Sequence, residues 1–407
     1  MATLSPPPGA ACCGARPPHS VGRSNMDVRG SSTGCAFYEQ GIDLTPPPGA
    51  ACCGARPPHS VGRSEVLHAM AVARPDCRMT VFVPQGTDAP NGSPAIAHRP
   101  LPSARFIGRH LQWPGRIRAL RPNAFFSPAG VLPLRQIGCP TVITVHDLAI
   151  YRKREWFPAG QPLSTGWIVP RSLRNADRVI AVSQNTASDL QALFGVPASR
   201  ISVVHEGVSN LFRPLGSEDL KDARARLKLP ERFILFVSTI EPRKNLDTLL
   251  EAWAMMRDRP DLVVVGGWGW RYEGIRARMQ RLGPGLRHLE GLDPAELPAV
   301  YNLALMLAHP AWYEGFGLPP LEAMACGTPV IVSDTSSLPE VVGDAGLIVP
   351  ADSPEAWRQA LEAVAGDADL AADLRRRGIL RAAEFSWERS ADLTWNAVDE
   401  VVRKASA

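Results

Sequence analysis

The chain has 407 residues, 45% of them hydrophobic and 21% charged, and its formal net charge is +4 at pH 7. This length is typical of two domains, and the composition is that of a soluble globular protein. No apolar run approaches the ~20 residues of a transmembrane helix, and prolines and glycines interrupt the N-terminus where a signal peptide would be apolar. We therefore expect a cytoplasmic protein in which the eight cysteines, none at zinc-ligand spacing, remain thiols.

The N-terminal region contains a repeat, because residues 6–24 recur letter for letter as residues 46–64. Two copies are too few for a solenoid, so a recent duplication or a misread gene start is indicated. Residues 1–36 are rich in Pro, Gly and Ser and are predicted to be disordered. The first strand is expected to begin near Phe37, and the second copy of the repeat then follows this strand and leads into a helical pattern.

Three apolar segments of the first domain are predicted to be buried strands, each followed by a turn or a helix start: residues 79–84, 141–147 and 179–183. Ser183 and Thr186 are both candidate caps of the helix that continues to Leu193. The first domain is expected to span residues 37–225.

The charge of this domain is uneven. Between Asp88 and Asp147 there is no acidic residue, whereas seven arginines fall there: Arg99, Arg105, Arg109, Arg116, Arg118, Arg121 and Arg135. The predicted basic surface either attracts an anionic membrane or a lipid-phosphate acceptor, or is an ordinary solvated face. Nucleic acid binding is not expected, since no recognition motif accompanies the charge.

The second domain, expected over residues 226–384, contains four more apolar segments separated by helical patterns: residues 234–238, 262–267, 305–309 and 330–334. Strands that alternate with helices predict α/β domains, each with a doubly wound parallel sheet. In such sheets, ligands bind outside the carboxyl ends of the strands. The last segment, 385–407, is predicted to be an amphipathic helix and a tail.

The segment 313–334 carries the most specific functional signal, because Glu314 and Glu322 stand eight positions apart across a glycine-bearing turn and a helix start. A helix start beside such a turn presents N–H groups that attract phosphate. Carboxylates would repel the phosphate, so we assign them to the hydroxyls of a neighbouring sugar and a ribose. The alternative for Glu322 is that it only complements the helix dipole.

The turn consists of Gly315, Phe316 and Gly317, and its two glycines allow the backbone to approach a ligand closely. The helix that follows is predicted from Leu318 to Cys326, with prolines in its first turn. We interpret this turn and helix as a binding site for a phosphorylated sugar.

Two cations and two histidines lie at other strand ends. Arg243 and Lys244 precede a helix start, where cations oppose the helix dipole and suit a diphosphate instead. His146 is near the end of a predicted strand, a placement that suits a hydrogen bond to a sugar hydroxyl. His309, just before the glycine turn, either reaches the phosphates or simply packs.

These residues stand in ordered blocks, among them PTVITVHDL, VVHEGV, EPRKN and YEGFGLPPLEAMACGTPVIVSD. From Gly41 onward the chain resembles the retaining glycosyltransferases of family 4, and the blocks look most like the bacterial mannosyltransferase branch of polysaccharide and glycolipid synthesis. The resemblance implies two Rossmann-like domains that face a central cleft in the GT-B arrangement, with a C-terminal helix that crosses back onto the first domain.

The resemblance also implies roles for individual residues. His146 and Glu314 are expected to be catalytic, by facing the donor's hexose and orienting its hydroxyls. The donor-binding residues are expected to be Arg243, Lys244, Gly315, Phe316, Gly317, Leu318 and Glu322. Gly62 and Arg63 match an acceptor or phosphate loop, although relatives lack the Cys-Cys pair found in this one.

For the reaction, the resemblance implies retention of anomeric configuration without an enzymic nucleophile, metal or other cofactor. It makes GDP-mannose the expected nucleotide-sugar donor. The expected acceptor is a glycan or a polyprenyl-phosphate-linked carrier, which would place the protein in the cytoplasm or at the inner face of the membrane.

Three other functions are considered. A metal-dependent glycosyltransferase of the other common fold needs an Asp-x-Asp triplet after a strand, but the triplet Asp367–Asp369 lies in a polar stretch that is better interpreted as a turn and a helix cap. A sugar-nucleotide epimerase shares the architecture. A catalytically impaired sugar-nucleotide-binding protein fits the altered N-terminal loop.

Overall fold

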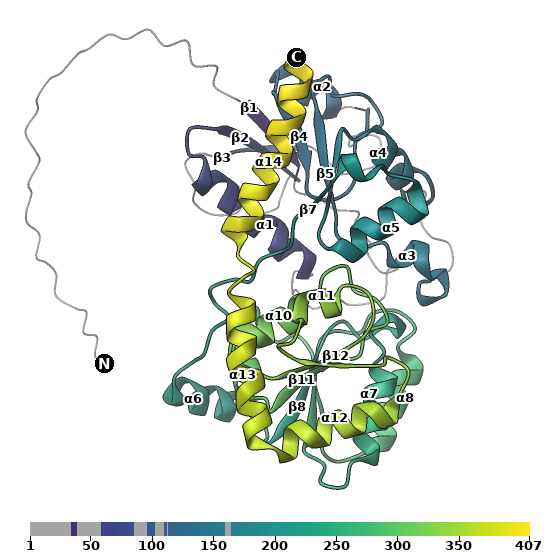
Figure 1. Ribbon diagram of the computed structural model, residues 1–407, viewed down its shortest axis with the longest axis vertical. Helices are drawn as coiled ribbons and strands as arrows, with labels where there is room; N and C mark the ends of the chain where they lie inside the picture. The colour runs from purple at the N-terminus through teal and green to yellow at the C-terminus, as the bar shows by residue number, and fades with distance from the viewer. Residues whose placement is uncertain (1–33, 39–57, 85–95, 102–109, 112, 159–163) are drawn as a thin grey trace, which may run out of the picture. The chain divides into compact units, whose positions relative to one another are not determined.

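The computed structural model (Figure 1) describes these residues: 34–38, 58–84, 96–101, 110–111, 113–158 and 164–407. Of residues 1–36, which were expected to be disordered, residues 1–33 lie outside the described residues. The expectation is wrong for residues 34–36, which belong to a strand. Strand β1 (Gly34–Tyr38) begins three residues before the expected Phe37, because Gly34 already pairs with Arg78 of the neighbouring strand. The described residues from Gly34 onward belong to one compact unit.

The first sheet has, among the described residues, seven parallel strands in the order β3-β2-β1-β4-β5-β6-β7. The order reverses beside β1, and such a switch point is where α/β sheets place ligands. The three segments predicted as strands are confirmed as β2 (Arg78–Pro84), β5 (Thr141–Val145) and β6 (Arg178–Ala181). The sequence analysis did not predict β3 (Ile96–Leu101), β4 (Ala124–Ser127) and β7 (Ile201–Val203).

Helix α5 (Gln184–Phe194) shows how the sequence sets the ends of a helix in this domain. The Ser183 hydroxyl accepts a hydrogen bond from the Thr186 N–H at 3.0 Å, and the helix ends at Gly195, whose φ of 63° is left-handed. Ser183 is therefore the cap, and Thr186 lies inside the helix. The other helices of this part are α2 (Trp113–Ala119), α3 (Ala149–Arg152) and α4 (Val169–Asn175).

Helix α1 (Pro58–Ala73) corrects the expectation of an acceptor loop at Gly62 and Arg63. Both residues lie within the helix, which begins inside the second copy of the repeat. Proline at the first helical position has its φ already set for a helix and loses no hydrogen bond there. Residues 58–64, the described end of the duplicated segment, therefore form the start of a helix where a glycine-rich loop was expected.

The second sheet, in the part of the chain after residue 226, has six parallel strands in the order β10-β9-β8-β11-β12-β13. Strand β8 (Phe233–Val237) is buried on both faces, since Phe233, Leu235 and Val237 pack into one hydrophobic cluster and Ile234 and Phe236 into another. The remaining strands are β9 (Asp261–Val265), β10 (Leu286–Leu289), β11 (Met306–His309), β12 (Val330–Ser333) and β13 (Leu347–Val349).

Helices cover both faces of this sheet, as expected for a doubly wound domain: α6 (Ser217–Leu227), α7 (Leu246–Met255), α8 (Glu273–Leu282), α9 (Leu297–Leu303), α10 (Leu318–Ala325), α11 (Leu338–Val342), α12 (Pro354–Gly366) and α13 (Ala368–Ala382). The Asp367 carboxylate accepts hydrogen bonds from the N–H groups of Asp369 and Leu370. The interpretation of the Asp-x-Asp triplet as a turn and cap is confirmed.

The last helix, α14 (Trp387–Ser406), lies beside α1 (Figure 1). Its Trp395 is buried, and the indole N–H donates to the Met70 carbonyl at 2.9 Å, while Asp399 accepts two hydrogen bonds from Arg74. The predicted crossing of the C-terminal helix onto the first domain is confirmed. No helix among the described residues is both long and apolar enough to cross a membrane.

The two sheets are joined by buried polar contacts as well as by the chain. The Ser183 hydroxyl donates to the Gly315 carbonyl at 2.7 Å. The Tyr313 hydroxyl donates to Asp189 of α5 at 2.7 Å, and Asp189 also accepts a hydrogen bond from Arg152 at 2.8 Å. Asp189 is 1% exposed. One buried carboxylate thus links the loop before α10 to two helices of the first domain.

We predict that Asp189→Ala lowers the free energy of unfolding by about 3 kcal/mol, because hydrogen bonds to a charged acceptor are lost and the Tyr313 hydroxyl is left buried without this acceptor. Urea unfolding checks this value. Asp189→Asn is the matched control, since its amide oxygen still accepts one bond and the loss should be smaller. Equal stability of wild type and Asp189→Ala would contradict a structural role for this link.

Candidate functional site

The structure brings together most of the residues that the sequence assigned to one site. His146 follows β5, Lys244 ends the short 3-10 turn Pro242–Lys244 after β8, and Glu314 lies in the loop between β11 and α10. A Cβ atom on Gly315 would lie 1.7 Å from the carbonyl oxygen of His146. The close approach that was expected between the glycine backbone and a ligand is therefore made between Gly315 and the His146 carbonyl, at the point where the two domains meet.

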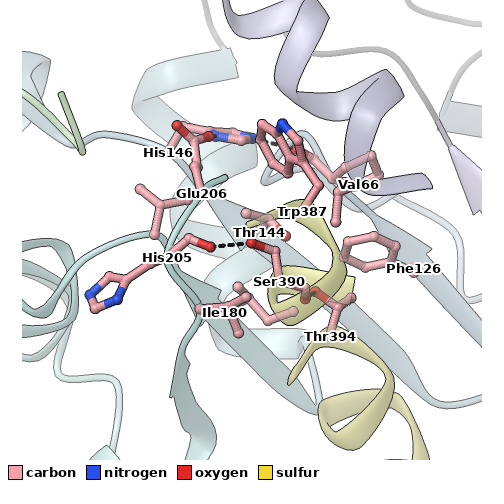
Figure 2. Close-up of a pocket in the computed structure, with 13 residues that line it drawn as sticks. Val66, Phe126, Thr144, His146, Ile180, His205, Glu206, Trp387, Ser390 and Thr394 are labelled. Atoms are coloured by element: carbon pink, nitrogen blue, oxygen red, sulfur yellow. Dashed lines mark hydrogen bonds and ion pairs between the residues drawn. The ribbon is translucent and has the colours of Figure 1, made fainter. Parts of the chain in front are cut away.

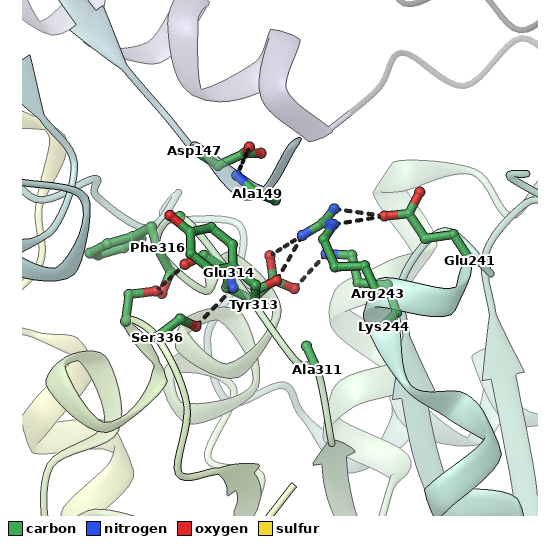
Figure 3. Close-up of polar contacts among 12 residues, drawn as sticks. Asp147, Ala149, Glu241, Arg243, Lys244, Ala311, Tyr313, Glu314, Phe316 and Ser336 are labelled. Atoms are coloured by element: carbon green, nitrogen blue, oxygen red, sulfur yellow. Dashed lines mark hydrogen bonds and ion pairs between the residues drawn. The ribbon is translucent and has the colours of Figure 1, made fainter. Parts of the chain in front are cut away.

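Glu314 is the centre of a buried cluster of charges (Figure 3). Its Oε1 accepts hydrogen bonds from Lys244 Nζ and, at 2.8 Å, from His309 Nε2, while its Oε2 lies 3.4 Å from an Nη of Arg243. Burial by itself raises the pKa of Glu314, but Lys244, His309 and Arg243 outweigh burial and hold this pKa well below its usual range. Glu314 is therefore an ionised, fixed carboxylate.

Arg243 is held mainly by a second carboxylate. Its Nη2 lies 2.7 Å from Glu241 Oε1, and its Nη1 donates to the Tyr313 carbonyl at 2.8 Å. Two buried cations thus face two buried carboxylates, Glu241 and Glu314. The diphosphate assigned to these cations from the sequence would have to compete with Glu314 for them.

His146 contacts acceptors with both ring nitrogens: Nδ1 lies 2.8 Å from Glu206 Oε1, and Nε2 lies 2.8 Å from the Pro128 carbonyl oxygen. Sequence reasoning quoted the VVHEGV block but did not single out Glu206. The signal was available, since Glu206 follows β7 and so lies at the same edge of the first sheet as His146.

His146 and Glu206 line a pocket of about 340 Å³, part of it open to solvent, together with Trp387 and Ser390 of α14 (Figure 2). The other lining residues come mainly from the strands of the first sheet and include Phe126, Thr144 and Ile180. The pocket is therefore lined by apolar side chains of the strands and by the hydrogen-bonded pair of His146 and Glu206.

Glu322 lies in α10, where its Oε2 accepts a hydrogen bond from the Tyr301 hydroxyl at 2.8 Å. Burial raises the pKa of Glu322 to about 7, and the Tyr301 hydrogen bond only partly opposes this shift. The proposed contact of Glu322 with a ribose would therefore form in a poorly solvated environment, where a hydrogen bond to a carboxylate contributes more than in water.

The turn residues act through their backbone. Phe316 is 4% exposed and packs against His205 and Phe385, with ring centroids 5.8 Å away in both cases, and Leu318 packs against the same cluster. Pro319 and Pro320 carry no N–H, so the phosphate donors at this helix start are limited to groups up to Leu318.

Two serines that the sequence argument missed hold this turn. The Ser336 hydroxyl accepts a hydrogen bond from the Glu314 N–H at 2.8 Å, and the Ser337 hydroxyl donates to the carbonyls of Glu314 and Phe316 at 3.0 and 2.5 Å. Ser336 has a φ of 54°, which is uncommon for serine. Their position just after β12 places them at the sheet edge that carries the site.

The arginines of the acid-free stretch are exposed where they are described: Arg99, Arg116, Arg118, Arg121 and Arg135. Arg105 and Arg109 lie outside the described residues. Exposure is compatible with both alternatives, so attraction to an anionic membrane stays a prediction. Cys77, Cys139 and Cys326, the cysteines whose state the structure gives, are free thiols, as expected. No group of three metal-ligating side chains occurs among the residues that the structure describes.

Comparison with known proteins gives matches over both domains. The family model described as Glycosyl transferases group 1 matches residues 218–381, and that of Glycosyltransferase Family 4 matches residues 63–210. The chain is 32% identical over 263 residues to O-antigen chain mannosyltransferase B of Escherichia coli, a match that covers 63% of this chain and 69% of that relative. It is 35% identical over 272 residues to D-inositol 3-phosphate glycosyltransferase of Segniliparus rotundus, with coverages of 63% and 60%.

The solved structure of sucrose-phosphate synthase from Thermosynechococcus elongatus superposes with a TM-score of 0.73 at 22% identity, covering 92% of this chain and 100% of that one. This likeness bears on the fold alone. It confirms the GT-B arrangement of two Rossmann-like domains that was expected from the sequence.

We predict that Glu322→Gln raises the free energy of unfolding near pH 8 by about 2 kcal/mol and changes it little near pH 4. The folded-state pKa of Glu322, about 7, lies above the ordinary 4.5. Its contribution to stability is therefore complete below the ordinary value and is lost as pH rises through the folded value.

Urea unfolding at the two pH values checks this prediction. Glu290→Gln, at an exposed position of the same domain, is the control and should show no such dependence. A pH-independent effect of Glu322→Gln would mean that Glu322 is well solvated.

Proposed function

Because the chain belongs to the family 4 glycosyltransferases, we propose that it moves a hexose from a nucleotide-diphosphate sugar to a glycan or lipid-linked acceptor, with retention of anomeric configuration. The observation that carries this proposal is the buried cluster of Arg243, Lys244 and Glu314, which lies at the carboxyl edge of the second sheet and against the backbone of His146. The cluster supplies both cations for a diphosphate and a fixed carboxylate for sugar hydroxyls.

In the proposed reaction, the bond between the anomeric carbon and the β-phosphate oxygen breaks, and the acceptor hydroxyl oxygen bonds to that carbon on the same face. The departing β-phosphate takes the acceptor proton. Arg243 and Lys244 stabilise the charge that develops on the diphosphate, in a site where burial strengthens each electrostatic interaction. Glu314 orients the hydroxyls of the hexose, and Glu322 accepts from the ribose. Since the two cations can supply the stabilisation, we propose that no divalent metal is required.

The donor that we propose is GDP-mannose. This choice is supported by the mannosyltransferase from Escherichia coli among the relatives, whereas the relative from Segniliparus rotundus carries a different activity in its name. The proposed acceptor is a glycan or a polyprenyl-phosphate-linked sugar, for surface polysaccharide synthesis at the inner face of the membrane. The exposed arginines would be accessible to an anionic carrier.

A second candidate function rests on helix α1. In this candidate the first domain does not position an acceptor, because Gly62 and Arg63 lie inside a helix and not in the expected acceptor loop. The protein would then bind the nucleotide sugar without transferring the hexose. Family membership favours a transferase over an epimerase.

A panel of sugar nucleotides separates these candidates. Purified protein is incubated with GDP-mannose, GDP-fucose, UDP-glucose and UDP-galactose, with and without a glycan acceptor, and released nucleotide is measured. We expect release from GDP-mannose that is unchanged in excess EDTA. Loss of activity in EDTA that Mg²⁺ or Mn²⁺ restores would contradict the metal-free proposal. Binding without release in all cases would favour the second candidate.

We predict that Lys244→Ala lowers turnover by about 100-fold, because it removes a donor from the developing diphosphate charge. It should also lower the free energy of unfolding by about 3 kcal/mol, since the buried Glu314 loses an ionic partner. The matched control is Lys221→Ala, which removes an exposed lysine whose partner Glu218 is also exposed and should change neither value. Wild-type turnover in folded Lys244→Ala protein would refute the assigned role.

A further inference from the structure

His309 forms a contact with Glu314 that differs in kind from those of the two cations. The His309 side chain is fully buried at the end of β11, and its ring stacks on Phe236, with centroids 6.4 Å apart and an interplanar angle of 20°. Its Nε2 lies 2.8 Å from Glu314 Oε1. The ring is therefore fixed by a strand and by packing, whereas Lys244 and Arg243 carry flexible side chains.

The protonation of His309 is consistent with one donated hydrogen bond. Burial lowers the pKa of His309, although Glu314 opposes this shift, and Nδ1 has no hydrogen-bond partner among the described residues. A neutral ring with its proton on Nε2 donates to Glu314 and leaves no buried N–H without an acceptor. His309 thus contributes a hydrogen bond without contributing charge to the site.

The cations, in contrast, have two competing partners once a donor enters. A diphosphate carries more negative charge than a single carboxylate, so it draws Lys244 Nζ and the Nη1 of Arg243 away from Glu314. Arg243 keeps its contact with Glu241 through Nε and Nη2. The groups that face Glu314 are Lys244, Arg243 and His309, with Glu241 beyond Arg243. Of these, His309 is buried and uncharged, so the charge of the diphosphate does not attract it and it keeps its hydrogen bond to Glu314.

We propose that His309 is a positioning residue that holds the Glu314 carboxylate in place while Arg243 and Lys244 turn to the diphosphate of the donor. The proposal rests on the function proposed above and answers whether His309 reaches the phosphates or only packs. The Glu314 backbone is held separately by Ser336 and Ser337, so His309 acts on the carboxylate alone. Glu314 Oε2, which has one contact at 3.4 Å, then remains able to accept from a hexose hydroxyl.

The test compares two substitutions in the full chain. His309→Leu removes the N–H donor and keeps an apolar group against Phe236, whereas His309→Gln keeps an N–H near the position of Nε2. We measure kcat, KM and the pH profile for release of GDP from GDP-mannose, and the Kd of GDP alone. GDP lacks the hexose, so its binding reports the cations without the contact made by Glu314.

For His309→Leu we expect kcat to fall about 10-fold or more, as for loss of one hydrogen bond to a charged group, with less than about a 2-fold change in the Kd of GDP. The acid limb of the kcat/KM profile should move to higher pH, because burial then raises the pKa of Glu314 with one fewer donor to oppose it. His309→Gln should retain activity within about 3-fold of wild type and keep the acid limb in place.

Trp253→Phe is the control for general damage, since it removes a buried N–H donor of the same domain, here bonded to the Pro260 carbonyl at 2.7 Å. It should lower stability without changing kcat. If His309→Leu does not fold, His309→Asn takes its place, because the shorter amide does not reach Glu314 and should show the same loss of turnover.

Three results would overturn the proposal. If the wild type is active and His309→Leu has the same turnover and the same acid limb, then His309 is not required to position Glu314. A parallel weakening of GDP binding would place His309 in the phosphate site instead. No nucleotide release by wild type from any sugar nucleotide would overturn the proposed function, and this role with it.

Discussion

The rest of the site depends on a carboxylate buried among cations. Burial removes water from the Glu314 carboxylate, which is unfavourable. Lys244, Arg243 and His309 replace the lost hydration with ionic and hydrogen-bond contacts, so the loop can hold a buried charge. The same contacts give the site its geometry, since they fix the carboxylate before any ligand arrives. In the proposed reaction, such a preorganised carboxylate would require little rearrangement when a hydroxyl of the donor's hexose replaces one of its internal partners.

The parallel sheets explain why these groups meet. Strands β5, β8 and β11 all end at an edge that faces the other domain, and each is followed by a loop or short turn that carries polar residues of the site. Glycine at position 315 lets the two edges approach to backbone contact, because any side chain there would overlap the His146 carbonyl. The buried bond between Tyr313 and Asp189 holds this junction beside the site.

Three residues assigned to the proposed donor site are each hydrogen-bonded to a second residue that fixes the side chain. His146 is held by Glu206, Glu314 by His309, and Glu322 by Tyr301, each across 2.8 Å. The holding residues lie on strands or helices or directly after a strand, so their own positions are set by packing. Catalytic groups in loops gain their precision from such partners.

The sequence by itself determined the strands β2, β5, β6, β8, β9, β11 and β12, the helices α5 and α10, and the site residues at the glycine turn and at the strand ends. These features follow from local rules: apolar segments of strand length, Ser183 as a cap, glycines at the turn and charged residues at strand ends. The helix start at Pro58 was missed, because residues 58–64 resemble a loop in composition and their helical conformation is not signalled by apolar spacing.

Only the tertiary structure decided which charges meet. That Lys244 and Arg243 pair with Glu314 and Glu241, and that His309 donates to Glu314, depends on contacts between segments up to 71 positions apart. The pKa shifts have the same origin, since burial of Glu314 and Glu322 is a property of the packed domain and not of any single segment. A sequence motif shows which residue type stands at the end of a strand. Which partner that residue contacts depends on distances and burial in the folded domain.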